Sequence, residues 1–146
     1  MAQNANCYIA VDLGAESGRV MLGRVGDGRL SLEQVHRFAN GPMEQQGSLR
    51  WDFDRLLSDI KTGIGLAAKK AGGPVQGIGV DTWGVDFGLL GEDGKLLGKP
   101  YHYRDSRTNG VMDKAFAKMP KRQVYENTGI QFMQLNSLYQ LLAMRL

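Results

Sequence analysis

The sequence has a single cysteine, Cys7, and lacks any long hydrophobic run. One cysteine excludes an internal disulfide and a cysteine-based metal cluster. Cys7 begins an apolar segment, where a buried thiol is expected. No apolar stretch approaches the ~18–20 residues that cross a bilayer, and residues 1–6 lack the basic-then-apolar layout of a signal peptide. The sequence therefore predicts a cytoplasmic protein that does not bind membranes.

The sequence also lacks any segment in which charges of one sign are concentrated. Lys and Arg number 18 against 15 Asp and Glu, for a formal net charge of +3. The two signs alternate along the chain without a basic stripe, so no nucleic-acid partner is expected. Glycine, by contrast, is abundant at 20 residues, about double the usual ~7% share. The glycines follow no fixed period, which predicts turns and close backbone approaches and excludes collagen-like or low-complexity structure.

Apolar periodicity in the first half of the chain predicts an antiparallel meander followed by a helix. Three strands are expected, joined by glycine-bearing turns, at Tyr8–Leu13, Arg19–Val25 and Leu30–Phe38. A loop is expected at Asn40–Gly47. Asp52 is predicted to cap a helix with its carboxylate, and Gly72 to end that helix. The predicted buried stripe of this helix consists of Phe53, Leu56, Leu57, Ile60, Ile64 and Ala67.

The second half of the chain predicts further strands and then helices. Short strands are expected at Gln76–Asp81, as a buried strand, and at Val85–Leu90. Beyond Pro100, helices are expected at Ser106–Met119, Arg122–Asn127 and Ser137–Leu146, with Pro120 and Asn136 at boundaries. No internal repeat and no linker divides the chain. Together these elements predict an α/β fold with a mixed sheet and flanking helices.

The first candidate site is the segment from Asp12 to Arg19. A carboxylate ends a predicted buried strand, and a turn with two glycines, a hydroxyl and a guanidinium follows. Backbone amides and Ser17 can bind phosphate oxygens, Arg19 can neutralise charge, and Asp12 can hold Mg²⁺ directly or through water. The alternative is a plain β-hairpin turn with solvated polar residues. The segment is not a Walker P-loop, because it has no Gly-Lys-Ser/Thr and a strand follows it.

The second candidate site surrounds Trp83, Gly84 and Asp86, where polar residues separate two predicted strands. A polyol needs a flat apolar face together with carboxylates that accept hydroxyl protons. Trp83 and Asp86 supply both, and Gly84 leaves space beside the indole. The alternative is that Trp83 belongs to the core and the aspartates Asp81 and Asp86 are turn residues.

A third polar segment runs from Tyr101 to Arg107. It can line a polar pocket, but Asp105 and Ser106 are also typical helix-capping residues, and capping is the favoured interpretation. His36 and His102 are too isolated in the sequence for a metal site. Each is expected to be a surface or half-buried side chain.

Taken in order, these blocks resemble the FGGY carbohydrate kinases, and among them the rhamnulokinases. The resemblance covers nearly the whole chain. Its most specific blocks are Asp81-Thr82-Trp83-Gly84-Val85-Asp86-Phe87 and Tyr103-Arg104-Asp105-Ser106-Arg107-Thr108-Asn109-Gly110. The remaining blocks are Val11–Ala15 with Ser17–Arg19, His36-Arg37-Phe38, Trp51-Asp52, and Thr128–Phe132.

The resemblance implies an actin-like, ribonuclease-H-like domain that binds ATP with Mg²⁺ and a sugar. It places Asp12 beside the β- and γ-phosphates, and Gly84, with Trp83 nearby, against L-rhamnulose, which becomes the 1-phosphate. It implies ATP contacts from Ala15, Glu16, Ser17, Gly18 and Arg19. Glu16 stands where many relatives have a small hydroxyl residue. A carboxylate facing phosphates is repulsive, so we expect Glu16 either to point away from them or to act only through a metal ion.

The resemblance also implies that residues 1–146 form an incomplete N-terminal kinase domain without its second domain. Members of the family use a catalytic aspartate that lies beyond residue 146, so no catalytic base is expected here. Because phosphoryl transfer depends on positioning and electrostatics, the chain alone is expected to be inactive. Three alternatives remain open: another FGGY sugar kinase, a non-catalytic domain, and a ribonuclease-H-type nuclease in which Asp12, Asp81 and Asp86 gather metals.

Overall fold

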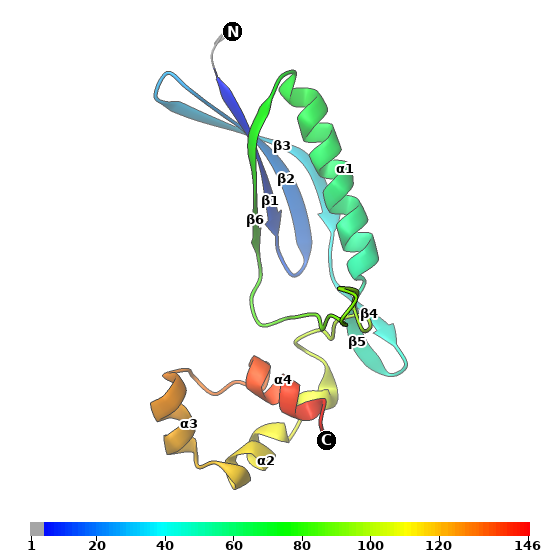
Figure 1. Cartoon of the computed structure of the whole chain (residues 1–146), viewed down its shortest axis with the longest axis vertical. Coiled ribbons are helices and arrows are strands. Elements are labelled where there is room, and N and C mark those ends of the chain that lie inside the picture. The colour runs from blue at the N-terminus through cyan, green and yellow to red at the C-terminus, as the bar shows by residue number, and fades with distance from the viewer. Residues whose placement is uncertain (1–4) are drawn as a thin grey trace. The chain divides into compact units, whose positions relative to one another are not determined.

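The computed structural model describes residues 5–146, which fold into two compact units (Figure 1). The first unit contains the chain up to Gly41 together with Asp52–Gly84. The second contains Pro42–Trp51 and Val85–Leu146. The chain therefore passes from the first unit to the second and back before it enters the second again. The sequence has no linker that would have predicted this division.

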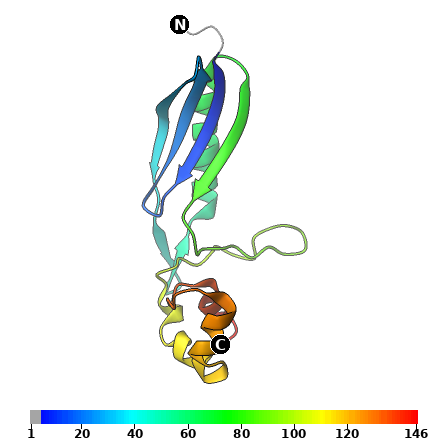
Figure 2. The same cartoon turned by 90° about the vertical axis from the view of Figure 1, so that its left-hand side faces the viewer.

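The first unit is built on a four-stranded mixed sheet in the order β3-β2-β1-β6 (Figure 2). Its strands are β1 (Asn6–Leu13), β2 (Ser17–Gly26), β3 (Arg29–Ala39) and β6 (Val75–Thr82). The first three form an antiparallel meander, and β6 pairs with β1 in parallel. The predicted meander and the mixed sheet are both confirmed.

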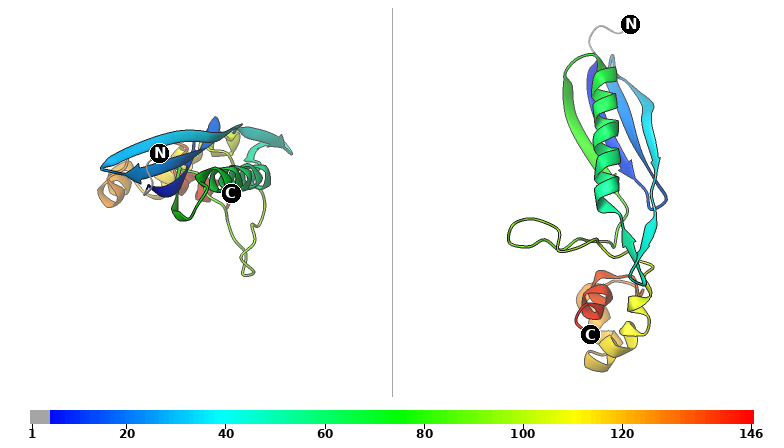
Figure 3. Two further views of the ribbon diagram at one scale, coloured as in Figure 1. Left: turned by 90° about the horizontal axis from the view of Figure 1, so that it is seen from above. Right: turned by 90° about the vertical axis from the view of Figure 1, so that its right-hand side faces the viewer.

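Helix α1 (Phe53–Ala71) covers one face of this sheet (Figure 3). It packs on β1, β2 and β3, and alternate residues of β1 and β2 point toward it. The helix ends where predicted, at Gly72, whose φ of 69° suits a residue without a Cβ. The side chain of Asp52 stands at the N-cap position but makes no capping hydrogen bond, so that expected bond is absent. The buried core of the unit comprises Ile9, Val11, Leu13, Val20, Phe38, Leu56 and Ala67.

The predicted stripe of α1 is wider than the surface that the helix buries. Leu56 and Ala67 are buried, and Ile60 and Ile64 pack partly against the core. Phe53 and Leu57, in contrast, remain 38% and 36% exposed. The predicted burial of β6 is also wrong, because β6 is an edge strand that leaves most of its side chains exposed.

The second unit begins with a small hairpin that the sequence did not predict. The segment expected to be a loop, Asn40–Gly47, contributes strand β4 (Pro42–Gln45), which pairs antiparallel with β5 (Ser48–Trp51). Gln46 and Gly47 connect the two strands with φ of 53° and 75°. Two successive positive φ values are typical of a two-residue hairpin turn. Gln-Gly is a weaker signal for this turn than Asn-Gly, which explains why the sequence failed to indicate it.

The strand predicted at Val85–Leu90 does not form. Val85, three residues after the end of β6, has a φ of 69°, which lies outside the range of a β-strand. The following residues make only an isolated antiparallel bridge between Leu90 and Leu96. The segment up to Tyr101 is therefore an irregular loop, visible as the long excursion in Figure 2.

Two of the three helices predicted in the second unit are shorter than expected, and the middle one, α3, extends one residue further at each end. The helix expected at Ser106–Met119 is divided at Gly110, whose φ is 72°, into a 3₁₀ turn and an α-helix. The residue that caps the first piece is Asp105, which accepts a hydrogen bond from the Arg107 amide, rather than Ser106. Asn136 precedes the last helix as expected but makes no side-chain cap. The elements are η1 (Ser106–Thr108), α2 (Val111–Lys118), α3 (Lys121–Thr128) and α4 (Ser137–Ala143).

None of the helices within residues 5–146 is long and apolar enough to span a membrane.

Candidate functional site

The turn between β1 and β2 presents the candidate phosphate-binding backbone. The amide of Gly14 donates to the Ser17 carbonyl at 3.0 Å, which closes the turn around Ala15 and Glu16. Glu16 is exposed, while Ala15 and Ser17 are half-buried. Within the described chain, the amides of Ala15 and Glu16 donate to no other group. Free amides in a tight turn are what an anion-binding backbone requires.

Asn40 holds this turn in place, and the sequence did not single it out. Its side-chain amide donates to the Gly14 carbonyl at 2.9 Å, and its backbone amide donates to the Glu16 carbonyl at 2.9 Å. Both carbonyls are thereby tied to the residue that follows β3. The conformation of the turn is therefore stabilised by Asn40 as well as by the residues of the turn itself.

Gly18, the second residue of β2, is a glycine for a packing reason. A Cβ placed on Gly18 would lie 2.3 Å from the ring of Phe38 on the neighbouring strand. The buried aromatic ring therefore occupies the space of the missing side chain. Gly18 acts as a packing residue, and the expectation that it also contacts ATP remains a prediction.

A row of charged residues crosses the sheet in register on the face opposite α1. Arg37, Arg19, Asp12 and Asp81 are successive partners on β3, β2, β1 and β6. Since Val11 and Leu13 point into the helix-covered core, Asp12 between them points to the other face. That face is turned toward the viewer in Figure 2. The register thus joins the predicted residues Asp12 and Arg19 to Arg37, which the sequence did not select, and to Asp81, which it grouped with Asp12 only under the nuclease alternative.

Within the row, cations stand on one side and carboxylates on the other. Arg19 Nε lies 3.1 Å from Asp12 Oδ2, and the two side chains are 40% and 48% exposed. An ion pair this exposed contributes little to stability, so its two partners can exchange to a ligand at low cost. Arg37 donates from Nη2 to the Ser17 hydroxyl at 3.3 Å and so links the row to the turn.

The row is suited to a phosphate chain with a divalent cation. Mg²⁺ binds through one or two carboxylates and keeps several waters, and Asp12 and Asp81 are neighbours on parallel strands. The guanidiniums of Arg19 and Arg37 beside them can neutralise the remaining negative charge of the phosphates. Among residues 5–146 no group of three carboxylate, histidine or cysteine side chains is placed to hold a metal.

The predicted sugar-binding residues have different environments. Trp83 donates its backbone amide to the Leu13 carbonyl at 3.1 Å and packs partly against the core of the first unit. The interpretation of Trp83 as a core residue is thus supported in part. Gly84 is exposed, and a Cβ there would meet no atom within 4 Å. Open space beside Gly84 is what a ligand approaching the backbone needs.

Asp86, in the second unit, is held by a residue that the sequence did not connect with it. Trp51 donates from Nε1 to Asp86 Oδ2 at 2.7 Å. The indole is 2% exposed, and its ring centroid lies 4.4 Å from that of His102. The pair joins the Trp51-Asp52 block to the block around Asp86, two parts of the sequence that had no predicted contact.

His102 is buried, at 3% exposure, which corrects the expectation of a surface or half-buried side chain. Burial lowers the pKa of His102, an effect that the nearby charge of Asp86 partly opposes. Its Nδ1 accepts a hydrogen bond of 3.0 Å from the Arg104 amide, as a neutral imidazole can. His36 is half-buried, as expected.

Asp105 is a structural residue of the second unit. At 2% exposure it accepts hydrogen bonds from the backbone amides of Leu49, at 2.7 Å, and Arg107, at 3.0 Å. The favoured prediction that Asp105 is a capping residue is confirmed. The carboxylate also ties the β4–β5 hairpin to the segment that carries the helices.

Comparison with known proteins identifies the family. The model of the N-terminal domain of the FGGY family of carbohydrate kinases matches residues 7–144. The chain belongs to this family. A rhamnulokinase of Lactiplantibacillus plantarum is 48% identical over 134 residues, which cover 92% of this chain and 27% of that enzyme. The chain therefore spans about a quarter of the length of this curated relative.

Solved structures of other kinases share the fold. The gluconate kinase of Lactobacillus acidophilus superposes with a TM-score of 0.82 at 18% identity, over 97% of this chain and 28% of that one. The glycerol kinase of Plasmodium falciparum, solved with ADP, gives 0.73 at 17% identity, over 94% and 28%. These similarities establish the actin-like, ribonuclease-H-like fold that the motifs predicted.

Proposed function

We propose that this chain supplies the phosphate-binding half of an ATP-dependent sugar kinase that converts L-rhamnulose to L-rhamnulose 1-phosphate. The observation that carries the proposal is the in-register row from Arg37 to Asp81 beside the β1–β2 turn. It combines free amides, two guanidiniums and two carboxylates on one open face of the sheet. A role in L-rhamnose catabolism and a cytoplasmic location belong to the same proposal.

In this proposal each group of the site has a separate role. The amides of Ala15 and Glu16 and the Ser17 hydroxyl bind phosphate oxygens. Asp12, with Asp81 beside it, would hold Mg²⁺, and the ion would supply positive charge opposite the phosphates. Arg19 leaves its weak pair with Asp12 when a phosphate oxygen replaces that carboxylate. The expected ATP contact of Gly18 is through its backbone, because Phe38 fills the space beside its Cα.

The choice of L-rhamnulose rests on the 48% identity to a rhamnulokinase, which far exceeds the 14–26% identity to the other sugar and glycerol kinases compared. We assign Trp83, Gly84 and Asp86 to sugar binding. Gly84 gives the sugar access to the backbone, and Asp86, oriented by Trp51, accepts a hydroxyl proton in a hydrogen bond. None of these residues is assigned as the catalytic base.

We also propose that residues 1–146 are one part of a two-domain kinase and that this part alone transfers no phosphate. The test is a chimera in which this chain replaces the matching quarter of the L. plantarum rhamnulokinase. ATP-dependent phosphorylation is measured with L-rhamnulose, D-xylulose, glycerol and D-gluconate. We expect a preference for L-rhamnulose of at least tenfold in kcat/KM.

Controls separate the parts of the proposal. Asp12→Asn in the chimera should reduce kcat by roughly a hundredfold or more, since a metal ligand is lost at the transferring group. Equal activity on all four substrates would refute the sugar assignment while leaving the kinase assignment intact. Turnover by the isolated 146-residue chain would refute its proposed inactivity.

A further inference from the structure

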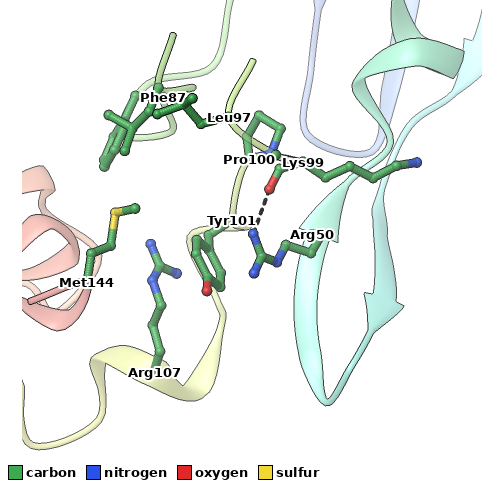
Figure 4. Close-up of a pocket in the computed structure, with 10 residues that line it drawn as sticks. Arg50, Phe87, Leu97, Lys99, Pro100, Tyr101, Arg107 and Met144 are labelled. Carbon is green, nitrogen blue, oxygen red and sulfur yellow. Dashed lines mark hydrogen bonds between the residues drawn. The ribbon is translucent and has the colours of Figure 1, made fainter. Parts of the chain in front are cut away.

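The second unit contains a small pocket that belongs to none of the proposed ATP- or sugar-binding residues (Figure 4). It lies between the segment that leads to η1, the hairpin β4–β5 and the end of α4. Its lining includes two guanidinium side chains and no acidic residue, whereas the side chain of Lys99 points away from the pocket. The residues that line it are Arg50, Phe87, Leu89, Leu97, Gly98, Lys99, Pro100, Tyr101, Arg107 and Met144.

Two guanidiniums are fixed on the ring of Tyr101 in this pocket. The guanidinium carbon of Arg50 lies 3.4 Å from the ring centroid, and that of Arg107 lies 3.8 Å from it. Figure 4 shows the two side chains on either side of the ring. Stacking holds each guanidinium in one plane, so two like charges are kept close together in a half-buried setting.

The charges of the two arginines are balanced differently. Arg107 Nη1 lies 3.5 Å from Asp105 Oδ1, and Arg107 Nη2 donates to Gln140 Oε1 at 2.6 Å. Arg50 donates from Nη1 to the Lys99 carbonyl at 2.8 Å, which carries no formal charge. Within residues 5–146, Arg50 forms no ion pair, and its buried Nε donates to no group. One half-buried cation in the pocket thus lacks a counter-ion.

A half-buried cation without a counter-ion is costly, and a bound anion removes that cost. Guanidiniums bind oxyanions in fixed geometry with charge-assisted hydrogen bonds. A carboxylate offers two oxygens, whereas a phosphate group offers three and carries up to two charges. The two guanidiniums on the pocket together offer more N–H donors than the two oxygens of a carboxylate can accept, so a phosphate group matches the available donors better. We propose that this pocket binds a phosphate group, independently of the ATP-binding turn in the first unit.

The test is a titration of the 146-residue chain with sodium phosphate, monitored by the shifts of its amide signals in NMR spectra. A parallel titration with sodium chloride at the same ionic strength and pH is the control. We expect saturable shifts at Gly98 and Tyr101 and at the Arg50 Nε–H. Arg50→Met should weaken this binding roughly tenfold by removing one charge-assisted contact. Arg122→Met is the matched control, because Arg122 lies on α3 and pairs with Glu126 on the surface; it should change the affinity less than twofold.

Further arms identify the ligand chemistry and the site. Arg19→Met should leave the shifts at Gly98 unchanged, since Arg19 belongs to the proposed ATP site. Sodium acetate should bind more weakly than phosphate; equal binding would overturn the assignment to phosphate. The pocket proposal is refuted by shifts confined to residues 14–19, by an absence of saturable shifts in the wild-type chain, or by equal losses in Arg50→Met and Arg122→Met. The wild-type titration gives these answers even if Arg50→Met does not fold.

Discussion

Trp51 Nε1 donates a 2.7 Å hydrogen bond to Asp86 Oδ2 across 35 residues of sequence. Trp51 ends β5 and is buried, while Asp86 lies in the irregular loop that follows β6. The bond connects two segments of the second unit, and stacking against His102 supports the indole from another side. Two rhamnulokinase-like sequence blocks are thus joined by one contact.

Trp51→Phe should destabilise the second unit by about 1–3 kcal/mol, because it removes a donor to a charged acceptor and part of a buried side chain. The measurement is urea unfolding of the variant and of the wild type. Trp83→Phe is the matched control, since Trp83 is only partly buried and Phe retains its apolar contact. A smaller loss for Trp51→Phe than for Trp83→Phe would contradict a structural role for the bond.

Gly63→Ala should destabilise the first unit by about 1–3 kcal/mol through overpacking. A Cβ at this position would lie 2.4 Å from Val20 Cγ2 and 2.9 Å from Val20 Cβ, so the helix would have to move from the sheet. Gly65→Ala on the same helix meets open space and should stabilise by about 0.5–1 kcal/mol through helix propensity. Thermal unfolding of the two variants and of the wild type measures whether each substitution destabilises or stabilises the protein. Similar effects from both substitutions would show that α1 does not pack closely at Gly63.

Stability should fall as the pH falls below about 6.5, in part because of His102. Burial lowers the pKa of this imidazole from its ordinary value of 6.5, so the unfolded chain takes up a proton before the folded chain does. The contribution is complete above pH 6.5 and is lost as the pH approaches the lowered pKa of the folded state. Unfolding free energies between pH 8 and pH 5 test this. The difference in unfolding free energy between the wild type and His102→Phe should become smaller as the pH falls. A difference that does not change with pH would exclude a contribution from the protonation of His102.

Glu16→Gln should lower the KM for ATP in the chimera by about two- to fivefold. The Glu16 side chain is exposed in the turn and forms no ion pair within the described chain, so its charge repels an approaching phosphate without compensation. Glu92→Gln, at an exposed glutamate in the second unit, is the control for net charge. An unchanged KM, with kcat also unchanged, would indicate that the turn does not face the phosphates.

Local patterns predicted the parts of the fold in which neighbouring residues decide the structure. The meander followed from alternating apolar residues and glycine turns, and α1 from its spacing and from Gly72. The predictions failed where a contact from elsewhere decides the conformation. Val85 adopts a positive φ, and the Gln46-Gly47 turn forms a hairpin without a strong turn signal. The buried environment of His102 was also not predicted, because its contacts with Trp51 and Leu49 come from a separate hairpin.

The segment from Asp12 to Arg19 also combines features that local sequence determines with features that distant contacts determine. By itself the sequence determined a glycine-bearing turn between two strands and, through the accompanying blocks, membership of the FGGY kinases. It did not determine which side chains stand beside Asp12. That depends on the register of four strands, because each strand places alternate side chains on opposite faces and a shift of one residue would turn them away. Only the tertiary structure brings Arg37, Arg19, Asp12 and Asp81 into one row, with Asn40 holding the turn beside it.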